Sequence, residues 1–545
     1  MANKRVVLIT FYDLDSFALH TLHAVLKGAG FEAHSIFFKS SNINTTSNQP
    51  TEREVADLIR LIKDIDPLIV GISFRSTFFN LALSITQEIK KNLGLPVIWG
   101  GTHPTIRPQQ CIEFTDMVCV GEGEGAIVEL CLRLSKNEPL DNIQNVWVNS
   151  GDKVVKNAPR FLIPDLDTLP FPDFSCENKH FIDNGNIAPI VLAPARTNYW
   201  VMTSRGCPFS CTYCYNSIGQ KIYKEKGQYV RRRSVENVIK ELTFAKRSFK
   251  NLRYISFLDD LFTFNLDWIR KFHGEYKKEV GLPFYCHIHP KFTGEEMIGL
   301  LKDAGCVGMT MGVQSGSSEC RHKYYERYES NEDIIRAAKN LHKEKIKCTY
   351  DLIMDNPLET DTDKRETFNL LLSLPRPFDL HIHSLTHFPE TRLTQLLLER
   401  KIITEDDVED RKQKSYKRWT PILDLDRKRE DLFWDNLYYL AQNKHLPKQL
   451  LIWLSNRSFL KKHPKPFTFL LRLTCHSIYS IRSGSALDTL RWSILTILSK
   501  PGVLFKKRSW FFIWSRIKIK LRLSTQENHS AKRESAFIKP ANRRN

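Results

Sequence analysis

Three cysteines stand close together in the string TSRGCPFSCTYCYN, at Cys207, Cys211 and Cys214. Thiolates are the usual protein ligands of iron–sulfur clusters, and three of them leave one iron of a four-iron cluster open to another ligand. A structural zinc site would need a fourth Cys or His at short spacing, whereas the nearest upstream candidates are Cys176 and His180. The spacing therefore favours a cluster with one open iron over zinc.

The rest of the chain allows such a reactive site. Its 545 residues, 42% hydrophobic and 26% charged, are typical of a folded protein of two or three domains, and its other cysteines are too scattered for a secreted disulfide framework. The start MANKRVVLITF lacks the longer apolar segment of a signal peptide, and no apolar run reaches the roughly 18 residues that cross a bilayer. We expect a cytoplasmic protein.

The cysteines directly follow the first of six strand-like runs, which alternate with helical stretches. Plausible helix caps are Ser234, Asn265 and Ser330. Six such units predict a partial (β/α)6 TIM-type barrel over residues 196–398, with its reactive groups at the C-terminal ends of the strands. The runs are 200–204, 252–258, 284–289, 307–314, 347–354 and 379–388.

An earlier alternation occupies residues 1–145, and one of its helices is marked by a capping box of Thr51 and Glu54. The pattern predicts a doubly wound, Rossmann-like α/β domain with a parallel sheet. Residues 146–195 are rich in proline and predict a linker or covering strap. The expected strands of the first domain are 5–11, 31–38, 68–73, 96–101 and 116–120.

The cysteine motif resembles the radical S-adenosylmethionine (SAM) superfamily, specifically its cobalamin-binding class, over about residues 5–395. The resemblance implies that the three cysteines hold a [4Fe-4S] cluster and that its open iron binds SAM. One electron would then cleave SAM to a 5′-deoxyadenosyl radical, which removes a hydrogen from the substrate.

Further strings extend the resemblance: FLDDLFTFN, GVQSGS, DLIMDNPLET and HFPETRL. By that likeness, contacts to SAM come from Tyr213, Asp259, Asp260, Gln314, Ser315 and Glu359. For the two aspartates, the alternative is a pair that caps a solvated helix. The chain departs from the family where Asp355, Leu358 and Glu390 replace common glycines. No residue is assigned a catalytic role.

The strings WGGTHPTIRPQQC and VCVGEGEGAIVEL resemble the cobalamin-binding domains that precede such barrels. The resemblance implies cobalamin contacts from Ser73, Gly100, Gly101, Thr102 and Glu122. Ordinary tight turns at the glycines, or a domain that has lost its cofactor, are the alternatives.

The Asp-x-His-x-x-Gly signature of a histidine-ligated cobalamin is missing from FYDLDSFALHTL, since His20 has no glycine three residues later. We therefore expect His20 to be a helix-face histidine. Cobalamin would then bind without a histidine ligand.

The net charge of +19 lies at the C-terminal end: 22 of the 80 Lys and Arg but only three of the 61 Asp and Glu follow residue 441, so the preceding residues carry 58 of each. Residues 399–523 predict a helical, basic and aromatic region, and 524–545 a disordered tail. The stretch 504–523 interleaves Trp and Phe with Lys and Arg, which favours an anionic membrane surface. Nucleic acid, or packing on the barrel with a solvated basic face, are the alternatives.

Taken together, these features predict a cobalamin-dependent radical SAM enzyme, in the first place a methyltransferase that acts on an unactivated carbon. The expected partners are a small-molecule or lipid-like substrate and an electron donor of the flavodoxin or ferredoxin type, with peripheral membrane contact through the basic tail. A cyclase or rearrangement enzyme of the same class is the alternative. From another class, the alternative is a non-catalytic metal-binding protein that associates with membrane or nucleic acid.

Overall fold

The structure is a computed structural model that describes residues 3–40, 49–189, 196–409 and 428–464. The predicted basic stretch 504–523 and tail 524–545 lie outside the described residues. Among those that are described, no helix is long and apolar enough to cross a membrane.

The first sheet has nine strands in the order β7-β6-β5-β4-β3-β1-β2-β8-β9. The pairs within β5-β4-β3-β1-β2-β8 are all parallel, and the edge strands β6, β7 and β9 pair antiparallel. The order β2-β1-β3-β4-β5 is that of a flavodoxin-like doubly wound sheet, which binds ligands where the order reverses between β1 and β3. The strands are β1 (Arg5–Phe11), β2 (Glu32–Phe38), β3 (Ile69–Ser73), β4 (Val97–Gly100), β5 (Met117–Cys119), β6 (Val146–Asn149), β7 (Val154–Lys156), β8 (Lys179–Asp183) and β9 (Asn186–Pro189).

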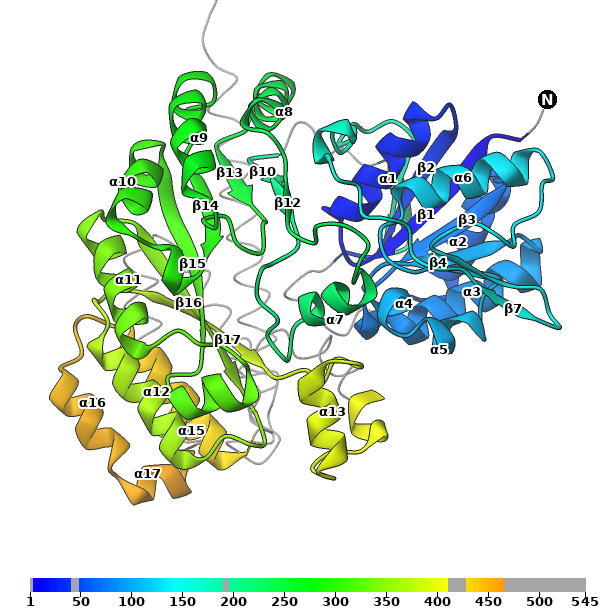
Figure 1. Cartoon of the computed structure of the whole chain (residues 1–545). Helices are drawn as coiled ribbons and strands as arrows, with labels where there is room; N and C mark the ends of the chain where they lie inside the picture. Colours follow the sequence, from blue (N-terminus) through cyan, green and yellow to red (C-terminus); the bar gives the residue numbers. More distant parts are fainter. Residues whose placement is uncertain (1–2, 41–48, 190–195, 410–427, 465–545) are drawn as a thin grey trace, which may run out of the picture. The chain divides into compact units, whose positions relative to one another are not determined.

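Helices cover both faces of this sheet (Figure 1). One hydrophobic core joins α2 and α3 to alternate residues of β1 such as Val7 and Ile9, and a second joins α1 and α6 to Val6 and Leu8. The predicted capping box of Thr51 and Glu54 begins α2. The helices are α1 (Phe17–Gly28), α2 (Glu52–Ile65), α3 (Phe79–Leu93), α4 (Thr102–Ile106), α5 (Pro108–Ile112) and α6 (Glu124–Ser135).

The segment 146–195, predicted as a linker or strap, differs from that expectation, because it contributes the four strands β6 to β9 to the first sheet. Each has only three to five residues, lies at or near an edge and comes from a proline-rich stretch. Such short edge strands carry too few alternations to be recognised by pattern.

The second sheet has six parallel strands in the order β10-β13-β14-β15-β16-β17, and Figure 1 shows helices along its outer side. This is the predicted partial (β/α)6 barrel, and Ser234, Asn265 and Ser330 cap its helices as expected. The strands are β10 (Asn198–Val201), β13 (Tyr254–Phe257), β14 (Phe284–Ile288), β15 (Cys306–Gln314), β16 (Lys347–Met354) and β17 (Asp379–Ser384). The helices are α8 (Val235–Ser248), α9 (Leu266–Glu279), α10 (Glu295–Asp303), α11 (Asn331–Lys343) and α12 (Asp361–Ser373).

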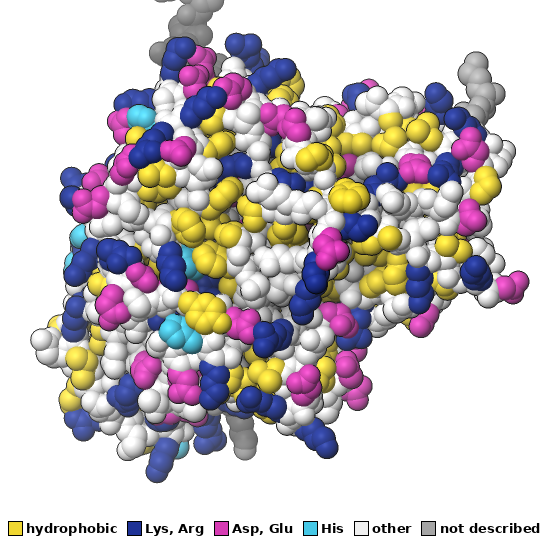
Figure 2. Space-filling view, in the orientation of Figure 1, with side chains coloured by type: hydrophobic (Ala, Val, Ile, Leu, Met, Phe, Trp, Pro, Cys, Tyr) yellow, Lys and Arg dark blue, Asp and Glu magenta, His cyan; other side chains and the backbone are white. Residues whose placement is uncertain are grey.

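Shorter elements complete the barrel. A ribbon of β11 (Ser204–Arg205) and β12 (Arg231–Arg232) follows β10 and frames α7 (Tyr215–Ile222), and α13 (Arg392–Glu399) follows β17. The helices α15 (Arg429–Ala441), α16 (Lys448–Ser455) and α17 (Ser458–Lys462) come next, and α15 packs on α12. Figure 2 shows Lys and Arg interspersed with Asp and Glu over the visible face, which agrees with the balanced charge before residue 442.

Candidate active site

The three cysteines lie on one short loop between β11 and α7, beside the C-terminal end of β10. The backbone N–H of Cys214 donates to the carbonyl of Cys211 at 3.0 Å, which turns the loop back on itself. Gly206, just before Cys207, has φ +83°, and a Cβ there would lie 2.5 Å from the carbonyl oxygen of Tyr229. Only glycine fits this close approach, so the loop is fixed where it begins.

Two side chains donate towards the sulfur atoms. Arg327 Nη1 lies 3.9 Å from Cys211 Sγ, and Asn216 Nδ2 lies 3.8 Å from Cys214 Sγ. Arg327 is buried and is itself held by Glu329 at 2.7 Å. Hydrogen bonds to the ligating sulfurs are among the interactions that tune iron–sulfur clusters.

The donor set fits a metal cluster chemically. Burial raises the pKa of Cys207 to about 12 and raises the pKa of Cys214 above its usual range, so the bare thiols are protonated. Metal binds to thiolates and releases those protons. With three sulfurs on one loop, Cys207, Cys211 and Cys214 match the three-thiolate requirement of a cluster with one open iron.

Asp259 and Asp260, at the end of β13, have different surroundings. The carboxylate of Asp259 is fully buried and accepts hydrogen bonds from the backbone N–H of Thr203 at 3.1 and 3.2 Å, from its hydroxyl at 2.7 Å, and from Ser204 Oγ. Asp260 is exposed and accepts from Asn216 Nδ2 at 3.0 Å. Asp259 thus holds the start of the cysteine loop, while Asp260 faces that loop; SAM contact by either stays a prediction.

Ser315 and Glu359 form a buried pair at the ends of β15 and β16. Ser315 Oγ donates to Glu359 Oε1 at 2.7 Å, and burial raises the pKa of Glu359 to about 7. Its second oxygen, Oε2, is buried and has no hydrogen-bond partner among the described residues. Gln314 precedes this pair with a left-handed φ of +66°. Their contacts to SAM stay predictions.

Tyr213 lies on the cysteine loop with its ring against Tyr325, at 5.1 Å between centroids and nearly perpendicular. It belongs to a hydrophobic cluster that includes Leu358, on the loop after β16. The expected place of its ring beside the adenine of SAM stays a prediction.

In the first sheet, four of the predicted cobalamin residues meet at the carboxyl ends of β3 and β4. Ser73 and Gly100 are paired in the ladder, Gly101 follows, and Thr102 begins α4. Gly101 has φ +95°, and a Cβ there would lie 2.8 Å from the carbonyl oxygen of Phe74, so glycine is required for this turn. The structure brings these four together at the predicted edge, and their contact with cobalamin stays a prediction.

The fifth, Glu122, joins the first sheet to the ribbon beside the cysteines. Its carboxylate accepts from Arg231 at 2.6 and 3.1 Å and pairs with Arg205 at 3.1 Å, and its backbone N–H donates to Tyr223 Oη at 2.6 Å. Although burial opposes it, the two guanidinium groups hold the pKa of Glu122 below its usual range. The loop after β5 and the cysteine loop are thereby linked through β11 and β12.

His20 lies on α1 and is fully buried between Phe37 and Phe174. Its Nδ1 is 2.7 Å from the carbonyl oxygen of Asp173, and its Nε2 is 3.3 Å from that of Leu14. Burial lowers the pKa of His20 to about 3. Since both ring nitrogens face backbone carbonyls inside the core, His20 is not arranged as a cobalt ligand.

A cavity of about 580 Å³ lies between the C-terminal edge of the first sheet and α7. Its walls include Ile106, Val120, Trp147 and Ile218, with Lys221 among the polar residues. None of the predicted cobalamin contacts lines it.

Several residues of the site were not predicted. Asn216 had a usable signal, since it stands two residues after Cys214, but Arg327 is far away in sequence and had none. A cluster of three further residues was also not predicted: Asp351 on β16 lies beside His381 and His383 on β17. Its signal was the alternation of polar and apolar residues in DLHIHS.

Family models match the two predicted α/β parts of the chain. Residues 4–131 match the B12 binding domain, and residues 201–371 match the radical SAM superfamily. Their order is the one predicted from the two alternating patterns.

Among curated proteins, the chain is 27% identical over 361 residues to the uncharacterized methyltransferase PH0819 of Pyrococcus horikoshii, covering 64% of this chain and 73% of that protein. It is 23% identical over 353 residues to the cobalamin-dependent radical SAM methyltransferase TokK of Streptomyces tokunonensis, covering 63% of this chain but only 49% of TokK. The fold is similar to that of the cobalamin-dependent SAM radical enzyme OxsB with aqua-cobalamin bound, with a TM-score of 0.60 and 16% identity over 93% of this chain and 82% of OxsB.

Proposed function

The chain belongs to the cobalamin-binding radical SAM enzymes, and on that premise we propose that it transfers a methyl group to an unactivated carbon of a small molecule. Its cofactors are a [4Fe-4S] cluster, SAM and cobalamin. Methyltransferases among its relatives support the choice of methyl transfer over the other reactions of this class. When bound, the cluster held by the three cysteines would supply the electron that cleaves SAM, and cobalamin would supply the methyl group.

The observation that carries this proposal is the contact between the loop after β5, at the predicted cobalamin edge of the first sheet, and the ribbon beside the cysteine loop. Glu122, beside the carboxyl edge of the first sheet, pairs with Arg205 and Arg231, whose strands frame the cysteine loop. A radical enzyme that uses cobalamin as methyl donor needs its two cofactors close to one substrate carbon, because reacting atoms must be held near contact distance. The ion pairs keep these two loops together.

Within this site, each chain residue has a proposed role. The cysteines would hold the cluster, Arg327 and Asn216 donate towards two of the cysteine Sγ atoms, and Asp259 fixes the start of the loop. The groups proposed to contact SAM are Tyr213, Asp260, Gln314, Ser315 and Glu359, and Asp259 contributes through the loop that it holds.

The electron comes from a reduced donor protein, which we propose to be of the flavodoxin or ferredoxin type. We also propose a cytoplasmic location with peripheral contact of the basic stretch 504–523 to an anionic membrane, which would suit a lipid-like substrate. Flotation with phosphatidylserine vesicles of the full chain and of a chain ending at residue 499 tests this contact. If the full chain and the shortened chain float equally, the proposed membrane contact of the basic stretch is wrong.

Anaerobic reconstitution with iron, sulfide and cobalamin tests the proposed reaction. With a strong reductant and SAM carrying a deuterated methyl group, we expect about four irons per chain, release of 5′-deoxyadenosine, and deuterated methyl on the bound cobalamin. Release of 5′-deoxyadenosine without label on cobalamin would instead favour the cyclase or rearrangement alternative. Zinc bound at the cysteines in place of iron, with no cleavage of SAM, would contradict the proposed radical reaction.

A further inference from the structure

Three side chains that the proposed mechanism does not use project from neighbouring strands of the barrel. Asp351 lies on β16 directly opposite His381 on β17 in the parallel ladder, and His383 follows two residues later on the same strand. Because successive side chains of a strand point to opposite faces, His381 and His383 share one face. Leu380 and Ile382, on the other face, are buried.

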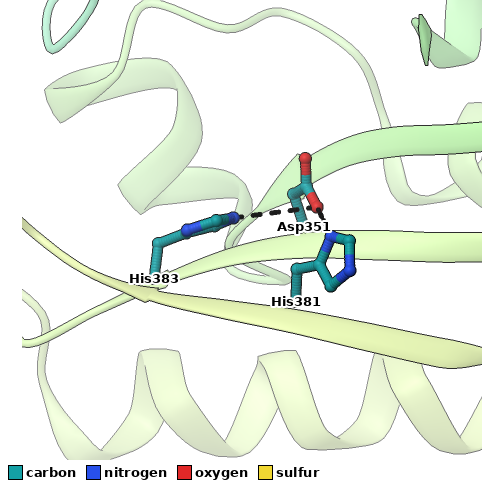
Figure 3. Close-up of side chains that lie close together, drawn as sticks. All are labelled: Asp351, His381 and His383. Atoms are coloured by element: carbon teal, nitrogen blue, oxygen red, sulfur yellow. Dashed lines mark hydrogen bonds and ion pairs between the residues drawn. The ribbon is translucent and has the colours of Figure 1, made fainter. Parts of the chain in front are cut away.

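The shared face is the inner one. Figure 3 shows all three side chains standing on the side of the strands away from the helix that runs beneath them. In a barrel of this type the helices cover the outside, so the opposite face lines the interior in which substrate is held. His381 and His383 are about half exposed, with 58% and 60% of their side-chain surface open, and Asp351 has 25%.

The three groups converge on one point. His381 Nδ1 lies 3.2 Å and His383 Nε2 lies 3.8 Å from the same oxygen of Asp351, Oδ1 (Figure 3). One ligand atom from each residue lies within 4.8 Å of those of the other two. A single hydrogen bond to Asp351 would need only one histidine. Here nitrogens of two histidines face the same oxygen, as the ligands of one metal ion would.

Neighbouring carboxylates are already engaged. Asp379, at the start of β17, pairs with Lys347 at 2.5 Å, and Asp355, beyond the end of β16, accepts from Ser384 Oγ at 2.5 Å. Asp351, in contrast, contacts two imidazoles, and a carboxylate with two imidazoles provides the oxygen and nitrogen ligands that zinc uses.

We propose that Asp351, His381 and His383 bind a divalent metal ion of the zinc type. With metal–ligand bonds of about 2.0–2.1 Å, tetrahedral ligand atoms lie roughly 3.3 Å apart, which is within the range of the observed separations. Small rotations of the exposed imidazoles bring all three onto one ion. β16 pairs with both β15 and β17, and six residues of the edge strand β17 are paired to it in register, so the backbone that carries the ligands is already in place.

Three protein ligands leave a fourth position of a tetrahedral ion open. Here that position opens into the barrel interior, where it would take an oxygen or nitrogen atom of the substrate, such as a carboxylate or an imine nitrogen. This role rests on the proposed function, because it assumes that substrate occupies the interior. The metal site itself does not depend on it.

Metal analysis of the full chain tests the site. The protein is first loaded with its iron–sulfur cluster, so that the cysteines are occupied, and is then equilibrated with Zn²⁺ in a competing chelator. We expect one tightly held zinc per chain, and at least about 100-fold weaker binding in Asp351→Ala and His383→Ala, since even residues behind the ligands can contribute 10–100-fold. Iron content should not change, which shows that the barrel is folded.

The matched control is His273→Ala. His273 Nε2 also contacts a carboxylate, that of Asp303 at 2.5 Å, but on the outer helices and without a second histidine. It should bind zinc as the unaltered chain does. The proposal is overturned if zinc affinity is the same with and without Asp351 and His383, or if His273→Ala weakens it as much; the former result would leave a hydrogen-bonded trio only.

Release of 5′-deoxyadenosine separates this proposal from the proposed function. A chain that binds zinc but does not cleave SAM would keep the metal site and lose the radical reaction. If the chain cleaves SAM but zinc affinity is the same in the unaltered chain and in the variants, the radical reaction stands and the metal site is wrong.

Discussion

Arg231 donates two hydrogen bonds to Glu122, at 2.6 and 3.1 Å, and so ties the loop after β5 to the ribbon beside the cysteines. The guanidinium is buried, with 5% of its side-chain surface exposed, and the carboxylate is mostly buried, at 19%. The contact is therefore shielded from solvent, unlike a surface ion pair.

Removal of this contact should loosen the cobalamin half of the site. In Glu122→Ala we expect the free energy of unfolding to fall by about 1–3 kcal/mol, because a buried charged donor loses its acceptor, and less cobalamin to remain after gel filtration. Chemical denaturation and the absorbance of bound cobalamin measure the two effects. Full retention of cobalamin in this variant would contradict the proposed link.

Replacement of one predicted cluster ligand should remove most of the bound iron and abolish SAM cleavage. Cys211→Ala should retain little iron and form no 5′-deoxyadenosine, because two thiolates cannot replace three. Iron analysis and chromatography of the SAM products provide the measurement. Cys176→Ser, which alters a partly exposed cysteine away from the loop, is the control and should behave like the unaltered chain.

Asp259 and Asp260 should separate stability from cofactor binding. Asp259→Ala removes a buried acceptor of several hydrogen bonds and should destabilise the chain by about 3 kcal/mol. Asp260→Asn, on an exposed side chain, should change Tm little and weaken SAM binding. Thermal unfolding and SAM titration check both, and equal Tm losses would show that the two residues share one structural role.

Glu359 predicts a pH dependence of stability. Burial raises its pKa to about 7 in the folded chain from 4.5 in the unfolded chain. The protonated form is thus favoured by folding, so its contribution is complete below pH 4.5 and is lost as pH rises through 7. At about 1.4 kcal/mol per unit, the loss is about 3 kcal/mol.

Glu359→Gln keeps an acceptor for Ser315 but cannot ionise. We expect it to be less sensitive to pH between 5 and 8 and to be more stable than the unaltered chain at pH 8. Denaturation at several pH values measures this difference. Parallel pH profiles for the two chains would mean that Glu359 titrates in its ordinary range.

The fold could be read from the sequence where the pattern was long. The interval Arg5–Phe11 was predicted to the residue because a strand buried on both faces forms a nearly continuous apolar run. The strand β16 was likewise predicted over Lys347–Met354, where buried residues alternate with less buried ones before an apolar end. The edge strands β6 to β9 were missed since three to five residues cannot show a period.

Within the site, residues next to a motif could be predicted and residues brought in by the fold could not. Cys207 and Gly101 lie inside recognisable strings, whereas Arg327 reaches Cys211 across 116 positions. The pairing of Asp351 with His381 likewise depends on the register of β16 and β17. A single sequence contains no information on such registers beyond the strands themselves.

The ribbon of β11 and β12 has a consequence for how the protein is matured. All three cysteines fit within eight residues, yet the loop is closed only when β12 pairs with β11, and its sulfurs meet Arg327 only after β15 is in place. When only the segment with the three cysteines has been synthesised, the ligands are therefore present, but β12 and Arg327, which position them, are not. Delivery of iron and sulfide should succeed late, on a chain whose barrel is already assembled, and retained iron then reports a completed tertiary structure.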